Sequence, residues 1–168
     1  MLIRGIASLA RWDGTTHVNR PDATTAGDVI SDLRTQNNTL SVWCADSEED
    51  INDAIVAMSL SRTSLSKIVA LLIDEADLKA MQISHSDEIM GEAPGAIEAI
   101  RKKHRDLIEI DYKRLGDLSG YMMKIVHDKG RRVEMTKPSL MKLLEEYRGV
   151  NKIIPKDMKP ELRETLRW

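Results

Sequence analysis

The chain has 168 residues, a net charge of −2, one cysteine and no phenylalanine. That length predicts one domain, and a single cysteine excludes an intramolecular disulfide. No apolar run reaches the ~18 residues of a membrane span, and the start lacks the features of a signal peptide. We therefore expect a cytoplasmic protein.

The charge is unevenly distributed along the chain. Residues 1–100 carry a net charge of −9, and residues 101–168 carry +7. One charged end can bind an acidic partner or nucleic acid. We favour the alternative, in which the two parts face each other in the fold and partly neutralise one another.

The first expected element is a strand in LIRGIASL, residues 2–9. A polar loop with Gly14 and Pro21 follows, and then a short helix with its apolar residues on one side, residues 26–36. The β-branched and aromatic stretch TLSVWCA, residues 39–45, predicts a second strand.

The clearest predicted unit is strand–helix–strand over residues 39–73. Ser47 can cap a helix by accepting from the backbone N–H of Asp50, and the apolar residues that follow recur at helical spacing. The run KIVALLI, residues 67–73, is typical of a strand buried on both faces. This order predicts a βαβ unit with parallel strands.

The second half reads as mainly helical. Apolar residues recur at helical spacing from residue 96 to about 126, although LIEID, residues 107–111, could instead be a break or a further strand. Thr136 and Pro138 are typical of a helix start. Residues 151–168 contain two prolines and are expected to be a tail that docks or is partly disordered.

These elements predict a small α/β or α+β domain over residues 1–150. Its sheet would be mixed, with three or four strands and the βαβ unit at 39–73. Helices would dominate the second half.

The segment VALLIDEADL, residues 69–78, resembles the Walker B segment of nucleotide hydrolases and the motif of the DEAD-box helicases. That resemblance implies that Asp74 and Glu75 hold Mg²⁺ beside a nucleotide. A Walker B site also needs a Gly-rich phosphate loop, and the chain contains no Gly-Lys dipeptide. We favour the interpretation that Asp74 caps the next helix.

Open α/β sheets bind ligands beyond the carboxyl ends of their strands. If the protein is an enzyme, Asp74, His85 and Asp87 are therefore the candidate catalytic residues after the 67–73 strand. No ligand set with metal-site spacing is present, so we expect neither a metal nor a cofactor.

Two further resemblances are shorter. HRDLIEID, residues 104–111, is similar to the catalytic loop of protein kinases, but no Gly-rich loop or Asp-Phe-Gly accompanies it. Arg4 on the first strand and His17 in the following loop suggest ADP-ribosyltransferase-like folds, which place an early Arg or His against the dinucleotide.

Basic residues in the second half suggest a nucleic-acid alternative. Lys129, Arg131, Arg132 and Lys137 lie in a passage, residues 111–147, that resembles a helix–turn–helix. The connection between its helices is longer than the usual turn, and the helix after Pro138 carries few cations.

We favour a small bacterial accessory protein that binds another protein and has no chemistry of its own, similar to immunity proteins and antitoxins. Its partner would be a basic toxin or nuclease, attracted by acidic side chains. These expected partner-binding residues are Glu48, Glu49, Asp50, Asp53, Glu75 and Asp77. The alternatives are a nucleotide-binding or ADP-ribosyltransferase-like enzyme with its site after the 67–73 strand, and a DNA-binding domain.

Overall fold

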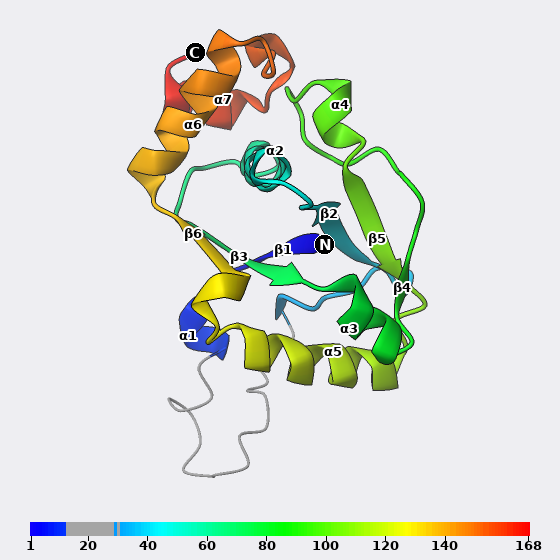
Figure 1. Cartoon of the computed structure of the whole chain (residues 1–168). Helices are drawn as coiled ribbons and strands as arrows, with labels where there is room; N and C mark the ends of the chain where they lie inside the picture. The colour runs from blue at the N-terminus through cyan, green and yellow to red at the C-terminus, as the bar shows by residue number, and fades with distance from the viewer. Residues whose placement is uncertain (13–28, 30) are drawn as a thin grey trace.

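The computed structural model describes residues 1–12, 29 and 31–168. The described residues form a six-stranded sheet with helices on both faces, as Figure 1 shows. The strands are β1 (Leu2–Ile6), β2 (Leu40–Cys44), β3 (Ile68–Ile73), β4 (Ser84–His85), β5 (His104–Ile108) and β6 (Arg132–Met135). The expected helix at 26–36 falls mostly on residues outside the described part.

The strand order is β4-β5-β2-β1-β3-β6, and each pairing is antiparallel. The α+β class is confirmed, but the prediction of a mixed sheet with three or four strands is wrong. Because β2 and β3 are both antiparallel to β1, they do run parallel to each other. They are not neighbours, however, since β1 lies between them and replaces the expected parallel ladder.

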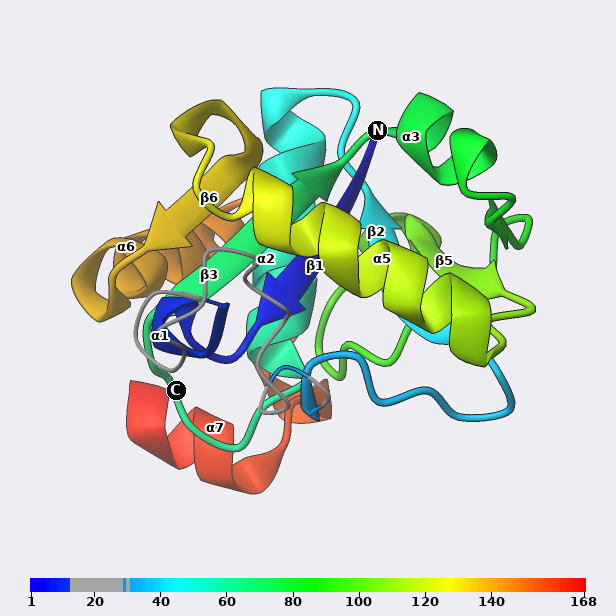
Figure 2. The same ribbon diagram turned by 90° about the horizontal axis from the view of Figure 1, so that it is seen from below.

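The helices are α1 (Leu9–Trp12), α2 (Glu48–Leu60), α3 (Glu75–Ala80), α4 (Glu98–Arg101), α5 (Tyr112–Ile125), α6 (Lys137–Gly149) and α7 (Pro160–Leu166), with short 3₁₀ turns η2 (Lys129–Arg131) and η3 (Pro155–Asp157). On one face of the sheet, α2, α6 and α7 enclose a core that contains Ile55, Leu144 and Leu162. On the other face, α5 crosses the sheet and buries Leu118 and Met122 (Figure 2).

Several helix starts follow directly from the sequence. Ser47 accepts from the backbone N–H of Asp50, and Thr136 accepts from that of Ser139. Asp74 likewise accepts from the backbone N–H of Ala76 and begins α3. Each hydroxyl or carboxylate satisfies a backbone donor that the first helical turn leaves unpaired.

Of the two strands in the second half, β5 overlaps the segment 107–111 that was left open as a break, a strand or a helix, and β6 was not predicted. Residues 97, 100, 104 and 107 have helical spacing, yet α4 ends at Arg101 and β5 begins at His104. Strand β6 is short and only partly buried, so its residues give a weak alternating pattern. The segment 151–168 is docked, because Ile153, Leu162 and Leu166 lie in the core.

Candidate functional site

A groove opens where the two central strands separate. β1 pairs with β2 only at Leu2–Cys44 and Ile3–Trp43, whereas β2 pairs with β5 from Leu40 onward. The guanidinium of Arg4 fills the gap and donates to the backbone carbonyls of Ser41 and Asp32. Arg4 therefore replaces the ladder hydrogen bonds that β1 no longer supplies.

Two overlapping cavities, of about 600 and 360 Å³, form this groove. They share Arg4, Ser41, Trp43 and Ser61. The larger cavity has a size typical of small-molecule sites. Its other lining residues include Arg34, Met90, Glu92, His104 and Asp106.

The polar floor of the groove comes from β1, β2 and β5, which are neighbours in the sheet. Ser41 pairs with Asp106 across the β2–β5 ladder, and the Ser41 hydroxyl lies 3.4 Å from Asp106 Oδ1. The backbone N–H of Asp106 donates to the hydroxyl of Ser86. The floor thus combines a guanidinium, a hydroxyl and a carboxylate.

His104 is buried beside this carboxylate. Its ring meets Trp43 edge-on at 4.9 Å, and its Nε2 is 3.8 Å from Asp106 Oδ1, too far for a hydrogen bond. Burial lowers the pKa of His104, so the imidazole is neutral at pH 7. In the described part of the chain its Nδ1 has no hydrogen-bond partner.

Arg4 brings a positive charge to the groove. Burial lowers its pKa to about 10, which still leaves the guanidinium charged at neutral pH. Asp32 and Asp106 favour the charged form from a distance, but within the described residues no carboxylate forms an ion pair with Arg4. An anionic ligand would supply that missing counter-charge.

The sequence candidates Asp74, His85 and Asp87 line none of the cavities of about 770, 500, 600 and 360 Å³ in the described part of the chain. Asp74 caps α3, and His85 Nε2 lies 3.3 Å from Glu75 Oε2. Asp87 is exposed. A cavity of about 770 Å³ does lie nearby between α3 and α5, but it is lined by other residues, among them Asp77, Gly116 and Tyr121.

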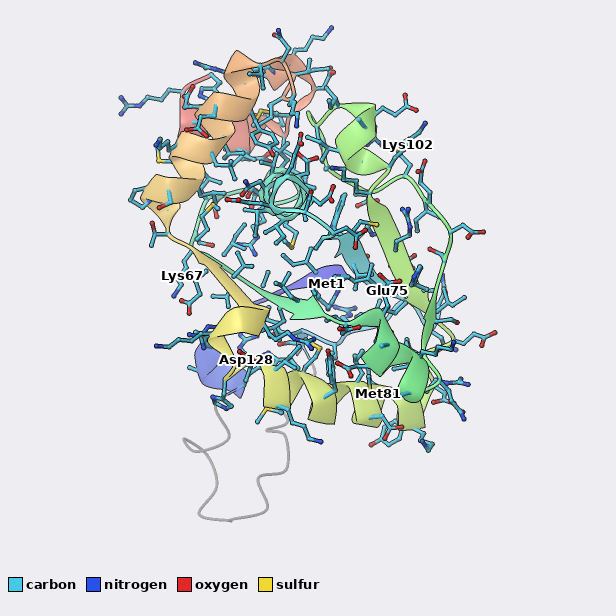
Figure 3. The ribbon with its side chains drawn as sticks, viewed as in Figure 1. Met1, Lys67, Glu75, Met81, Lys102 and Asp128 are labelled. Atoms are coloured by element: carbon cyan, nitrogen blue, oxygen red, sulfur yellow. The ribbon has the colours of Figure 1, made fainter. Side chains whose placement is uncertain are left out.

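The expected partner-binding residues gather at the opposite end of the sheet from the groove. Strands β2 and β3 both end there, so the starts of α2 and α3 are adjacent. The nitrogen of Met1 lies between them, 2.6 Å from Asp46 Oδ1 and 2.7 Å from Glu75 Oε1; Figure 3 labels Met1 and Glu75. The hydrogen bond from Met1 lowers the pKa of Glu75. We call this surface, residues 46–53 and 74–77, the acidic end.

Part of the acidic end is engaged inside the protein. Asp53 is 3% exposed, accepts from the hydroxyl of Tyr147 at 2.7 Å, and pairs with Lys103 and Lys152. Asp50 also pairs with Lys103, which lowers the pKa of Asp50. Glu49 and Asp77 also have a cation within 4 Å, but with Glu48 they lie at the surface and stay candidates for partner binding.

The proposed nucleic-acid residues lie around β6, so the expected helix–turn–helix passage contains a strand. Arg131 lies within 4 Å of both Asp74 and Asp77. Arg132 pairs with Glu134 and donates to the Val126 carbonyl. Lys129 and Lys137 have no partner among the described side chains, so half of this cationic set is internally neutralised.

Some sequence ideas have no structural support. HRDLIEID forms β5 and the turn before α5, and His17 lies outside the described residues.

Within residues 1–12, 29 and 31–168 there is no cluster of side chains suited to a metal ion. No helix in that same part is long and apolar enough to cross a membrane.

Comparison with known proteins gives no relative: no family model, curated protein or solved structure matches the chain. The site must therefore be interpreted from its own chemistry. Sequence reasoning identified Arg4 but missed Ser41 and Asp106. Their importance depends on β5 pairing with β2, and the sequence left open whether this segment is a strand.

Proposed function

We propose that the protein is an ADP-ribosyltransferase-like enzyme that binds a nicotinamide dinucleotide in the groove and cleaves its N-glycosidic bond. The observation that carries this proposal is the convergence of Arg4, Ser41 and Asp106 on one cavity of about 600 Å³. We favour the groove over the region after β3 because none of the cavities described above is lined by Asp74, His85 or Asp87.

Arg4 supports the binding step. ADP-ribosyltransferase-like folds place an Arg or His of an early strand against the dinucleotide, and Arg4 is on the first strand. Three of its N–H groups are engaged by carbonyls, which fix the orientation of the guanidinium. Its charge remains free to attract the phosphates of the dinucleotide.

Asp106 supports the chemical step. Breaking the bond between ribose and nicotinamide develops positive charge on the sugar, as in glycoside hydrolysis, and a nearby carboxylate stabilises that charge. Nicotinamide leaves with the electrons of the broken bond. An acceptor hydroxyl or water then attacks the sugar carbon, and its proton passes to Asp106. The Ser41 hydroxyl orients the carboxylate.

The test is release of nicotinamide from nicotinamide adenine dinucleotide by the purified chain, followed by chromatography. Replacing Asp106 with Asn keeps the shape and removes the charge, so the rate is expected to fall by about 10²-fold or more. Asp117→Asn on α5, whose carboxylate pairs with Lys113 alone among the described residues, is the matched control. Equal rates for wild type and Asp106→Asn, or no release by the wild type, would refute the proposal.

Protein binding remains a second candidate, and the acidic end favours it. The structure brings residues 46–53 and 74–77, separate in the sequence, onto one surface. Such a surface suits a basic partner, whose approach it would accelerate. In this second proposal the protein is an accessory protein similar to immunity proteins or antitoxins.

This second function is tested with the double variant Glu48→Lys/Glu49→Lys. Proteins captured from a cell lysate by the wild type are identified, and the dissociation constant of each is measured with both proteins. A genuine basic partner should bind the variant at least tenfold more weakly, with the largest loss at low salt. A partner whose affinity is unchanged by both charge reversals does not use the acidic end.

A further inference from the structure

Two more arginines line the groove on either side of Arg4. Arg34 belongs to the segment before β2 and lines the larger cavity. Arg62 follows the end of α2 and lines the smaller one. Since Arg4 and Ser41 line both cavities, the two cavities adjoin, and arginines from three separate segments line the groove that they form.

Neither flanking arginine is neutralised by the described residues. Arg34 is exposed and has no hydrogen bond or ion pair within the part of the chain that the structure describes. Arg62 is partly buried, and among the described residues its guanidinium makes one hydrogen bond, from NH1 to the Ser66 hydroxyl at 3.2 Å. Burial lowers the pKa of Arg62, and no carboxylate opposes that effect.

Two partly buried lysines elsewhere in the molecule have carboxylate partners. Lys103 is held by Asp50 and Asp53, and Lys152 by Glu49 and Asp53. A charge taken partly out of water without a counter-ion costs free energy. Arg4 and Arg62 are such charges, and an anionic ligand bound in the groove would offset the unfavourable free energy.

We infer that Arg34 and Arg62 form a diphosphate subsite, which holds the two linked phosphates of a nucleotide across Arg4. Guanidinium groups bind phosphate oxygens through paired N–H donors, which fixes the orientation of the ligand. The inference rests on the proposed function, since it names the residues that would hold the diphosphate of the dinucleotide while Asp106 acts on the sugar. The subsite would bind the diphosphate, a part of the ligand that Asp106 does not contact.

Calorimetric titration of the full chain with ADP, AMP and inorganic pyrophosphate tests this subsite. ADP is expected to bind more tightly than AMP, because the second phosphate gains an arginine. The variants Arg34→Gln and Arg62→Gln should each weaken ADP binding roughly tenfold and remove the preference for ADP over AMP. Lys124→Gln, which removes an exposed cation on the other face of the sheet, should change neither.

The outcomes separate the subsite from the proposed function. If ADP binds equally well to wild type, Arg34→Gln and Arg62→Gln, or if none of the three probes binds the wild type, the subsite is refuted. Asp106-dependent release of nicotinamide would still uphold the enzyme in either case. If the arginines control ADP binding but no nicotinamide is released, the diphosphate subsite stands and the transferase proposal fails.

Discussion

The groove and the acidic end lie at opposite ends of the same sheet, and they treat charge in opposite ways. At the acidic end each carboxylate except Glu48 has a cationic neighbour within 4 Å, such as Lys103, Arg131 or Lys152. In the groove Arg4, Arg34 and Arg62 have no carboxylate partner among the described residues. Most carboxylates at the acidic end therefore have a cationic partner within the protein, whereas the three arginines of the groove have none among the described residues.

The largest expected effect on stability comes from Asp53 at the acidic end. Asp53→Ala leaves the Tyr147 hydroxyl without its acceptor and removes a buried partner of Lys103 and Lys152. We expect the free energy of unfolding to fall by about 3 kcal/mol in urea titrations. Tyr147→Phe, which removes one hydrogen bond, should cost about 1 kcal/mol. A loss below that of Tyr147→Phe would show that the network does not stabilise the fold.

Substitution of Arg4 tests whether a groove residue also stabilises the fold. Arg4→Met removes the donors to the carbonyls of Ser41 and Asp32 and leaves both without these hydrogen bonds. The expected loss is about 2 kcal/mol in the same urea titration. Arg34→Met, at an exposed position without a partner, should change stability by less than about 0.5 kcal/mol. Equal losses for both variants would contradict the different roles assigned to them.

The two ends should also respond to acid in different pH ranges. Burial lowers the pKa of His104 below its unfolded value near 6.5, so the unfolded chain binds more protons as the pH falls from 7 to 5. Stability is therefore present above pH 6.5 and declines below it, by at most about 1.4 kcal/mol per pH unit. His104→Gln should show a shallower decline.

The carboxylates Asp50 and Glu75 have pKa values lowered by hydrogen bonds from Lys103 and Met1. Their contribution is present above the unfolded values near pH 4 and is lost only as the pH falls below them. Urea titrations from pH 3 to 7 would separate the two ranges. The same slope between pH 5 and 6.5 in wild type and His104→Gln would exclude a contribution from His104.

The smallest effect is expected for Glu48, the unpaired carboxylate of the acidic end. Glu48→Lys should change the free energy of unfolding by less than about 0.5 kcal/mol. Loss of the favourable interaction between an acid and the start of α2 sets that limit. A change above 1 kcal/mol would mean that Glu48 stabilises the fold and is not free for a partner.

Local signals predicted the parts of the fold that local chemistry controls. The caps Ser47, Asp74 and Thr136 begin helices as expected, because each bonds to a backbone group within three residues. The order of strands was not predictable in this way. β1 lies between β2 and β3 and pairs with both, although it is distant from them in the sequence. No pattern within residues 39–73 predicts this arrangement.

The same limit applies to the candidate site. Arg4 was identified because it lies on the first strand, where ADP-ribosyltransferase-like folds place an Arg or His against the dinucleotide. Ser41 and Asp106 are ordinary polar residues until the β2–β5 ladder places them opposite each other. In the sequence, Arg34 and Arg62 look like ordinary surface arginines. The fold places them along two adjoining cavities. The groove forms where separate segments of the chain meet, and no local pattern in the sequence predicts it.

The position of β1 has a consequence for how the chain acquires its structure. β1 comes first in the chain but is central in the sheet, and its partners β2 and β3 end at residues 44 and 73. During synthesis it has no complete set of neighbours until β3 has emerged. Such long-range pairings slow folding, so an unpaired, apolar β1 would remain exposed meanwhile. Occupation of β1 by a chaperone during synthesis would protect the chain from aggregation.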